Sequence, residues 1–202
     1  MVCLYHSQDY PKQSCGTGSV GIDLGLKDSA TASNGDKLTI KQTLKYAKQL
    51  AIAQRSNNKK RIKAIHAKIK NTRQDLIHKF TTQLVKDNAL IVVGDVKTTQ
   101  FNSKKGKLAK SVYDAGWFEL KRQLTYKCEN AGCRFEIVSE RYTTQTCSCC
   151  GDMSSSPKGR AGLRIREWTC ATCGTWHDRD INASRNILAV GLDRLVEGIP
   201  LL

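Results

Sequence analysis

Apolar positions along the chain follow two periods, and together they predict a mixed α/β fold. Residues 18–26 (GSVGIDLGL) predict a short strand that ends at an acid and a glycine. Residues 89–96 (ALIVVGDV) form a continuous apolar run typical of a buried central strand, and 133–140 predict another strand. The sequence Asn-Gly-Asp at 34–36 is a turn signal inside the alternating segment 29–39, which favours a hairpin.

The segments between these strands have helical periodicity. From about 39 to 87, apolar residues recur every three, four or seven positions, and the polar stretch 56–58 divides them into a helical hairpin. Residues 108–127 predict one helix, and 180–195 predict a closing helix. Since strands and helices follow one another in this way, we expect the later strands to join a parallel set through helical crossovers.

Length and composition are those of a soluble globular protein. The 202 residues suggest one domain, or one domain with a small appendage, and 40% hydrophobic residues are enough for a core. No apolar run is long enough to cross a bilayer, and the first ten residues lack the pattern of a signal peptide. We therefore expect a cytoplasmic protein without a membrane partner.

The charge of the chain is strongly positive. Lys and Arg number 33 against 18 Asp and Glu, a net charge of +15, which favours a nucleic-acid partner over a merely solvated surface. For the basic outer face of the helical hairpin, both interpretations stay open. The candidate nucleic-acid contacts are clustered cations: Lys104, Lys105, Lys107, Lys110, Arg160, Arg164 and Arg166.

Four of the nine cysteines form two C-x-x-C pairs, Cys147 with Cys150 and Cys170 with Cys173. Two such turns supply four thiolates to one tetrahedral zinc ion, and a glycine follows each pair, where the backbone of the turn needs one. With four thiolates and no open position, the zinc is expected to be structural. A redox motif is disfavoured because such motifs occur singly.

The remaining cysteines and one histidine are weaker candidates. Cys149 is interpreted as a bystander that could compete for the metal, and His177 could replace a ligand. The other thiols are interpreted as core or surface residues; they are Cys3, Cys15, Cys128 and Cys133.

Three acids stand at the ends of predicted elements: Asp23 and Glu140 after strands, and Asp180 at the start of the last helix. The carboxyl ends of parallel strands share one sheet edge, where sites of open α/β sheets lie. Carboxylates gathered there would repel one another unless they held Mg²⁺ or Mn²⁺, and two such ions could clamp a phosphodiester. Each acid also has a simpler interpretation. Asp23 could accept a hydrogen bond from a turn amide, and Glu140 could be an exposed acid at a strand end. Asp180 could only cap the helix, or Asp178 could be the metal-binding acid in its place.

Five segments of the chain form recognisable motifs: GIDLGLK at 21–27, IVVGDV at 91–96, TQTCSCCG at 144–151, REWTCATCG at 166–174 and HDRDINASRNI at 177–187. In these segments, which keep the family order and cover nearly the whole chain, the sequence resembles the RuvC-like nuclease half of TnpB (OrfB) proteins. These proteins are transposon-associated, RNA-guided DNA nucleases related to type V CRISPR effectors. The resemblance implies an RNase H-like (RuvC-type) mixed sheet with helices on both faces and an inserted four-cysteine zinc ribbon.

The resemblance also implies boundaries and roles. The nuclease core would span 1–141, with a helical insertion at about 41–88; the zinc ribbon would span 142–177, and the helix at 178–202 would complete the core. Asp23 is then the first catalytic acid and Asp180 the last, both binding Mg²⁺ or Mn²⁺ that activates a water. Cys147, Cys150, Cys170 and Cys173 would be the zinc ligands.

The sequence departs from the family in two respects. Where the family carries its middle glutamate, this chain has Gly94. Three explanations are open: Glu140 replaces the missing acid, Asp95 replaces it, or the site is inactive. Glu140 is favoured over Asp95, because Asp95 is shifted by one residue from position 94 and such a shift turns the side chain to the other face of the sheet. Family members also carry an N-terminal half that grips guide RNA and the DNA motif beside the target, and the chain begins just before the first catalytic strand.

The sequence therefore predicts a transposon-encoded, DNA-binding protein with a RuvC-like, metal-dependent DNA endonuclease domain. Its partners would be DNA and a guide RNA, the latter through the N-terminal half. The alternative is a truncated, non-catalytic remnant in which the zinc ribbon still binds nucleic acid.

Overall fold

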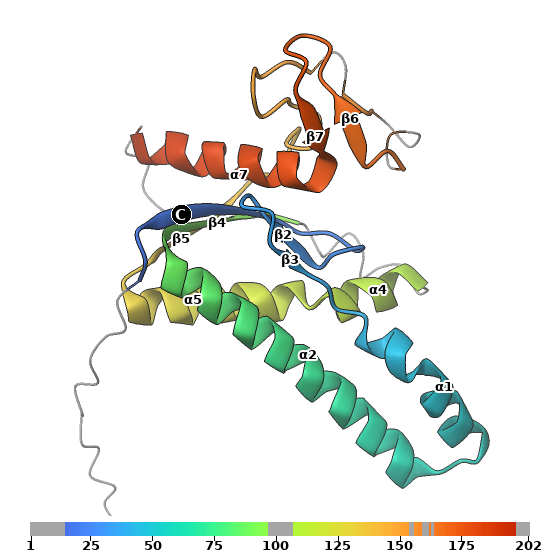
Figure 1. Ribbon diagram of the computed structural model, residues 1–202. Helices are drawn as coiled ribbons and strands as arrows, with labels where there is room; N and C mark the ends of the chain where they lie inside the picture. Colours follow the sequence, from blue (N-terminus) through green and yellow to red (C-terminus); the bar gives the residue numbers. More distant parts are fainter. Residues whose placement is uncertain (1–14, 97–106, 154–155, 159–161, 163, 197–202) are drawn as a thin grey trace, which may run out of the picture.

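A computed structural model describes residues 15–96, 107–153, 156–158, 162 and 164–196. For residues 107–110 it describes only the backbone. Figure 1 shows three layers: one helix above a sheet, the sheet itself, and two long helices below it. The fold is thus a mixed α/β fold with helices on both faces of the sheet, as the sequence predicts. In this part of the chain, no helix combines the length and the apolarity needed to cross a bilayer.

The sheet has five strands in the order β3-β2-β1-β4-β5. Its centre is parallel: β1 pairs with β4, and β4 pairs with β5. The β1–β2–β3 edge is antiparallel, and Gly35 takes a φ of +99° in the turn between β2 and β3, which confirms the predicted hairpin. The strands span Gly18–Asp23 (β1), Ala30–Ala32 (β2), Lys37–Leu38 (β3), Asn88–Gly94 (β4) and Arg134–Val138 (β5).

The helices separate into one above the sheet and a group below it. The helical hairpin is confirmed, with α1 (Gln42–Arg55) and α2 (Lys59–Asp87) divided at residues 56–58. The single helix predicted at 108–127 is wrong: α4 (Lys107–Ala115) and α5 (Trp117–Ala131) meet at Gly116, whose φ of +70° breaks the helix. Figure 1 places α7 (Arg179–Val196) alone on the upper face.

Two glycines allow α7 to lie very close to the sheet. A Cβ atom on Gly21 would lie 2.1 Å from the carbonyl oxygen of Ser184, and one on Gly191 would lie 2.4 Å from Val92 Cγ2. Both contacts are far shorter than atoms tolerate, so α7 can cross β1 and β4 at this distance only where the side chain is absent. This contact brings the start of α7 to the carboxyl ends of the parallel strands.

The lower face holds the larger core. Ile77 of α2, Leu120 and Leu124 of α5, and Ile91 of β4 are fully buried there. Trp117 at the start of α5 is also buried, and its indole Nε1–H donates to the carbonyl oxygen of Ser29, 3.0 Å away. Burial of these apolar side chains fixes α2 and α5 against the sheet and leaves the α1 end of the hairpin projecting (Figure 1).

A small module follows β5 and precedes α7. It contains the antiparallel pair β6 (Glu167–Thr169) and β7 (Trp176–Asp178) and the four cysteines of the two C-x-x-C pairs. We call residues 142–178, in their described part, the four-cysteine module. In Figure 1 it stands above the beginning of α7, on the side of the sheet opposite α2 and α5.

Candidate functional site: an acid cluster beside a four-cysteine cluster

Asp23 is the buried centre of a group of carboxylates. It ends β1, pairs with Thr31 of β2, and is 9% exposed. Its pKa is raised to about 7, first by burial and then by the negative charges of Asp180 and Glu140, while Arg179 and Arg166 oppose the shift. The charges of Glu140 and Asp180 thus reach Asp23. Their carboxylate oxygens do not all lie within 4.8 Å of one another, since among the described residues only the four cysteines meet that criterion. We call Asp23, Glu140 and Asp180 the acid cluster.

Glu140 fills the space beside Gly94. A Cβ atom on Gly94 would lie 3.5 Å from Glu140 Oε2 and 3.0 Å from Ile187 Cδ1 of α7. Gly94 is paired in register with Val138, the last residue of β5, and Glu140 follows two residues later. The carboxylate of Glu140 thus occupies the place into which a side chain at position 94 would point, on the face of the sheet that α7 covers.

Asp95 points to the other face. Its carboxylate forms an ion pair with Lys121 of α5, with 3.1 Å between Oδ1 and Nζ, and α5 lies below the sheet (Figure 1). Burial raises the pKa of Glu140, and the charge of Asp95 adds to that rise while Lys121 opposes it. Asp95 is near enough to influence Glu140, but its side chain is engaged by Lys121.

Asp180 lies in the first turn of α7 and does not cap it. The helix N-terminus is capped by Asp178, whose Oδ1 accepts hydrogen bonds from the amides of Asp180 (2.9 Å) and Ile181 (3.0 Å). The alternative in which Asp180 serves only as the cap is therefore wrong. Its two carboxylate oxygens each lie 3.2 Å from Nη1 of Arg166, the residue directly before β6.

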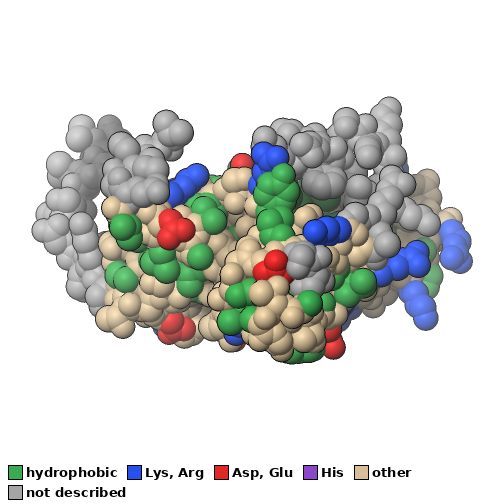
Figure 2. Space-filling view, turned by 90° about the horizontal axis from the view of Figure 1, so that it is seen from above, with side chains coloured by type: hydrophobic (Ala, Val, Ile, Leu, Met, Phe, Trp, Pro, Cys, Tyr) green, Lys and Arg blue, Asp and Glu red, His purple; other side chains and the backbone are tan. Residues whose placement is uncertain are grey.

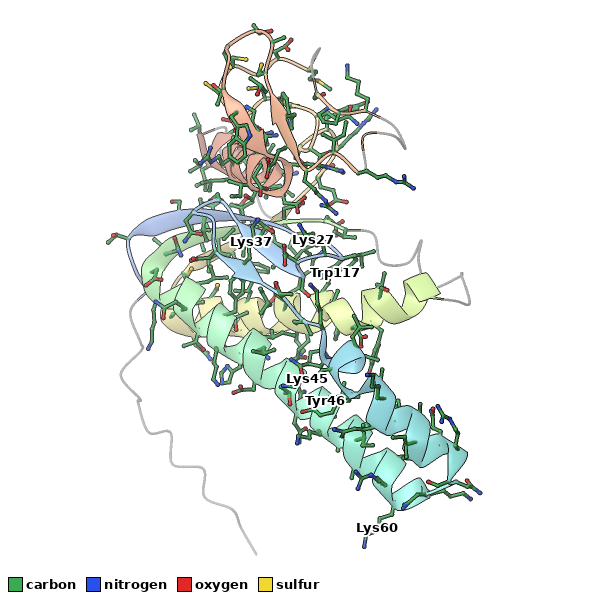
Figure 3. All side chains as sticks on the ribbon, turned by 45° about the vertical axis from the view of Figure 1, so that its right-hand side comes forward. Lys27, Lys37, Lys45, Tyr46, Lys60 and Trp117 are labelled. Atoms are coloured by element: carbon green, nitrogen blue, oxygen red, sulfur yellow. The ribbon has the colours of Figure 1, made fainter. Side chains whose placement is uncertain are left out.

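Asp178 also ties the module to the sheet. Its Oδ2 lies 3.1 Å from Nζ of Lys37 in β3, a side chain labelled in Figure 3. Although burial works in the opposite direction, the Ile181 amide and Lys37 lower the pKa of Asp178. Asp178 thus stays ionised as the cap and ion-pair partner that places Asp180 near Asp23.

The four cysteine sulfurs converge on one point. The Sγ atoms of Cys147, Cys150, Cys170 and Cys173 all lie within 4.8 Å of one another. Two of the Sγ–Sγ distances, Cys147 to Cys173 and Cys150 to Cys170, are 3.7 Å. Zinc–sulfur bonds of about 2.3 Å in a tetrahedron require sulfurs about 3.8 Å apart. The donor set and its spacing therefore fit a zinc ion.

The two C-x-x-C turns have the same backbone geometry. In each, the glycine after the second cysteine donates its N–H to the carbonyl of the first cysteine at 2.9 Å: Gly151 to Cys147, and Gly174 to Cys170. Both glycines have positive φ, +78° and +72°, so the expected left-handed position after each pair is confirmed. Two identical local turns thus account for all four sulfurs.

His177 is adjacent to the four-cysteine cluster but outside it. Its Nε2 lies 3.0 Å from Cys147 Sγ, a distance at which an N–H donates to a thiolate. The ring is buried, stacks on Trp168 at a centroid distance of 4.7 Å, and has a pKa lowered by burial and by Arg185. These contacts suit a residue that orients a ligand. Cys149 is exposed and is not one of the converging sulfurs.

Two asparagines of α7 fasten the first C-x-x-C turn to the helix. Nδ2 of Asn182 and Nδ2 of Asn186 both donate to the Thr146 carbonyl, at 2.8 and 2.7 Å, and Asn186 also donates to the Thr143 carbonyl at 2.8 Å. Oδ1 of Asn182 accepts from the Ser148 amide at 2.9 Å. We call these contacts the asparagine clamp; they connect Cys147 to the helix that carries Asp180.

Most of the predicted nucleic-acid contacts cannot be placed. Lys104, Lys105 and Arg160 lie outside the described residues, and the side chains of Lys107 and Lys110 in α4 are likewise not described. Arg164 and Arg166 are exposed, and Arg166 contacts Asp180.

Sequence analysis missed the residues that position the acids. Gly21, Lys37 and the asparagine clamp all bear on the acid cluster, yet none was assigned a role, and Asp178 was considered only as an alternative to Asp180. The motif segments at 21–27 and 177–187 contain most of them, so their position inside a motif was the available signal. Lys37 had no such signal, because only the folded sheet brings it to Asp178.

Comparison with known families agrees with this arrangement. The family model OrfB_IS605, described as "Probable transposase", matches residues 2–103, and the model "Cas12f1-like, TNB domain" matches residues 117–187. The first match covers half of the chain and includes β1 with Asp23. The protein therefore belongs to the OrfB_IS605 family.

Two curated relatives of the chain are named as putative RNA-guided DNA endonucleases. The chain is 39% identical over 190 residues to a "Putative RNA-guided DNA endonuclease" of Streptomyces pristinaespiralis, covering 87% of this chain and 46% of that protein. It is 33% identical over 199 residues to the "Putative RNA-guided DNA endonuclease InsQ" of Escherichia coli K12, covering 85% and 48%. The chain thus spans about half the length of these relatives.

Solved structures share the fold at low sequence identity. A "CRISPR-Cas12f Ternary Complex" superposes with a TM-score of 0.61 at 18% identity, covering 89% of this chain and 40% of that chain. A "Cas12f1-sgRNA-target DNA complex" gives a TM-score of 0.58 at 17% identity, covering 90% and 51%. At this identity the likeness establishes the mixed α/β fold.

Proposed function

We propose that the chain is the metal-dependent nuclease part of an RNA-guided DNA endonuclease of transposon origin. The observation that carries the proposal is the buried Asp23 at the end of β1, whose pKa is raised to about 7 first by burial and then by the charges of Asp180 in α7 and Glu140 after β5. Like charges buried together are destabilising unless cations neutralise them, and hard divalent cations prefer carboxylate oxygens.

In this proposal the acid cluster binds Mg²⁺ or Mn²⁺. Asp23, Glu140 and Asp180 supply the oxygens, and the bound ions would generate a nucleophilic water and stabilise the leaving oxygen of a phosphodiester. Glu140 takes the role that a glutamate at position 94 would have, because its carboxylate fills that space. Arg166, which contacts Asp180, would move onto a DNA phosphate once ions neutralise the acid.

The finer description of the fold also belongs to the proposal. The parallel centre β1–β4–β5 with α7 on one face supports an RNase H-like, RuvC-type core at 1–141, completed by 178–202, with the helical insertion at about 41–88. The matched C-x-x-C turns support a structural zinc ribbon at 142–177 that holds Zn²⁺ through its four cysteines. DNA and a guide RNA are proposed as partners because the curated relatives are named RNA-guided DNA endonucleases.

Mg²⁺-dependent cleavage is the direct test. Zinc-loaded protein is incubated with single- and double-stranded DNA, with and without guide RNA, over a Mg²⁺ series. The parent protein should cleave. Asp23→Asn should slow cleavage by at least about a hundredfold, because it removes a negatively charged carboxylate that would bind the divalent ions. Absence of Mg²⁺-dependent cleavage by the parent under every guide supply would defeat the nuclease proposal.

The assignment of the middle acid has a matched pair of variants. Glu140→Gln and Asp95→Asn each remove one charge from neighbouring positions on opposite faces of the sheet. We expect Glu140→Gln to match Asp23→Asn, and Asp95→Asn to stay within a few-fold of the parent. Equal losses from both variants would show that the assignment of Glu140 is wrong.

A rescue variant makes this test stricter. Gly94→Glu combined with Glu140→Ala moves the carboxylate to the adjacent strand, into the space that Glu140 vacates. Partial return of cleavage relative to Glu140→Ala alone is expected. Only the flexible end of Ile187 must yield, since its Cδ1 would lie 3.0 Å from the new Cβ.

A further inference from the structure

The α1–α2 hairpin carries most of the positive charge of the protein. Residues 41–87 contain thirteen Lys or Arg and two Asp, a formal net charge of +11 within a chain of net charge +15. Only two of these cations pair with a carboxylate in the described part of the chain: Lys79 with Asp75, and Arg73 with Asp114. The other eleven repel one another without internal neutralisation, which weakens the hairpin as an isolated structure.

The hairpin has only a small core of its own. Its buried cluster consists of Tyr46, Ala53, Ile65 and Ile69, separate from the main core under the sheet. α1 packs principally against α2, and the α1 end of the hairpin projects from the rest of the protein in Figure 1. The second half of α2, with Ile77 and Leu84, belongs to the main core. The cations of α1 and of the first half of α2 do not cover that core with their aliphatic stems, so the packing of the sheet does not account for them.

On α1 the cations lie on one side. Lys45 and Lys48 are three residues apart, Arg55 follows seven residues later, and Lys41 precedes Lys45 by four. At 3.6 residues per turn these spacings repeat on one face. All four side chains are exposed, whereas Thr43, Tyr46 and Ala53 on the other side of α1 are buried. The helix thus presents a row of positive charge to solvent, and the exposed side chains of Leu44 and Ile52 lie on the same side.

One lysine of α2 joins this row. The ammonium groups of Lys45 and Lys68 lie 5.9 and 5.5 Å from the centroid of the Tyr46 ring, so both helices contribute to one surface. Figure 3 shows Lys45 and Tyr46 on the hairpin, with Lys60 at its tip. Figure 2 shows blue side chains at the right-hand end of the molecule, the side on which the hairpin projects. We define the cationic face as Lys41, Lys45, Lys48, Arg55 and Lys68.

We propose that the cationic face binds the sugar-phosphate backbone of a nucleic-acid double helix. The row on α1 is about 20 Å long at 1.5 Å per residue, enough to contact several phosphates in succession. This inference rests on the proposed function, which supplies the nucleic acid. It adds a second contact surface for the duplex, on the hairpin and separate from the acid cluster.

The chemistry of the hairpin favours a duplex over a single strand. Unpaired bases are held by stacking on exposed aromatic rings. Among the described hairpin residues no Phe, Tyr or Trp is exposed, Tyr46 being only 8% exposed. The large apolar side chains exposed there are Leu44 and Ile52, which offer no stacking surface. Cations without rings contact phosphates irrespective of sequence, and both RNA and DNA duplexes provide that chemistry.

The test compares two triple variants of equal charge. The face variant is Lys41→Gln, Lys48→Gln, Arg55→Gln; it keeps Lys45 and Lys68 so that Tyr46 packing is unchanged, and Gln is a good helix former. The control variant is Lys59→Gln, Lys63→Gln, Lys70→Gln. At 100° per residue, these three positions lie roughly 140–180° around α2 from Lys68. Circular dichroism and the melting temperature check that both variants fold.

Binding is measured by fluorescence anisotropy over a salt series, on zinc-loaded protein without added Mg²⁺. The probes are a short RNA duplex, a short DNA duplex and the corresponding single strands. The face variant should weaken binding of at least one duplex by roughly tenfold or more and lower the salt slope by about 2–3, one unit per lost phosphate contact. The control variant should change both values much less, and the duplex most affected identifies the source.

Two results would overturn the inference: equal losses in the two triple variants, or a loss confined to single strands. Failure of the nuclease proposal is distinguishable, because it appears as absent Mg²⁺-dependent cleavage while face-dependent duplex binding persists. Conversely, a face variant with unchanged duplex binding and an active parent would leave the nuclease proposal intact and remove only this inference.

Discussion

The acid cluster and the four-cysteine cluster are built in opposite ways. The cysteines come from two local turns of the same design, each closed by a glycine with positive φ. The acids come from three elements far apart in sequence, and the charges of Glu140 and Asp180 reach Asp23 only because β1, β4 and β5 run parallel and α7 crosses them closely. The thiolates converge through short-range geometry, whereas the carboxylates converge through the topology of the sheet.

This difference separates the energetics of the two clusters. A structural zinc site contributes its binding free energy directly to folding, because the unfolded chain holds no such site. The acid cluster instead places like charges in a buried position, and the rest of the fold has to hold them there. The asparagine clamp and the Asp178 cap connect the two clusters. Folding of the four-cysteine cluster around zinc can therefore help to hold the acid cluster in place.

The largest expected effect is the loss of zinc. Cys170→Ser removes one of four thiolates, and we expect loss of bound zinc, of order in the module and of Mg²⁺-dependent cleavage together. Apparent binding free energies of structural zinc sites are roughly 10–16 kcal/mol, so the local fold depends on it. Metal analysis, near-ultraviolet circular dichroism and the cleavage assay measure the three effects. Cleavage that persists in zinc-free Cys170→Ser protein would show that the module is only an appendage.

Removing the buried charge should stabilise the protein without added Mg²⁺. The folded-state pKa of Asp23 is about 7, above its value of 3.8 in an unfolded chain. The native state therefore holds a proton that the unfolded state has lost, and stability falls as pH rises from about 4 to about 7. Asp23→Asn should flatten this fall, with a gain on the order of a few kcal/mol at pH 8.

Thermal melts from pH 5 to 8 measure this effect. Added Mg²⁺ should stabilise the parent at pH 8 and leave Asp23→Asn nearly unchanged, since the variant lacks the ligand. A parent protein whose melting temperature is independent of both pH and Mg²⁺ would contradict the interpretation of Asp23 as a buried metal ligand with a raised pKa.

The asparagine clamp offers a smaller perturbation that separates the two clusters. Asn182→Ala leaves the Ser148 amide without its acceptor, at a cost of about 1–3 kcal/mol. We expect zinc content to remain at one ion per chain while cleavage declines, because Asp180 loses its support. Asn186→Ala is the control: its two acceptors are also reached by Asn182, so its effect should be smaller. Equal zinc loss in both variants would mean that the clamp serves the metal and not the acid.

The smallest effect is expected at the ion pair between Lys37 and Asp178. The two side chains are 33% and 25% exposed, so solvent screens the pair and Lys37→Met should cost less than about 1 kcal/mol. Asp178 keeps its helix-capping bonds, and cleavage should change by a few-fold at most. A loss as large as that of Asn182→Ala would show that the link to β3 positions Asp180 more strongly than the clamp.

The sequence alone determined the features that depend on neighbours in the chain. Strand and helix periods, the hairpin at Gly35, the break at 56–58 and the two C-x-x-C turns with their glycines are all short-range patterns, and the structure bears them out. The helix predicted at 108–127 failed because one glycine with positive φ, Gly116, divides it. Periodicity averages over several turns and does not detect such a single-residue break.

Only the tertiary structure decided which side chains meet. The sequence favoured Glu140 over Asp95 as the replacement for an acid at Gly94, and it left an inactive site as the third possibility. The fold turned Asp95 toward Lys121 on α5 and placed Glu140 in the space that Gly94 leaves open. It also gave the helix cap to Asp178 and brought Lys37 to it. These contacts join residues distant in sequence, and they follow from the parallel register and from the close crossing of α7, neither of which a local pattern encodes.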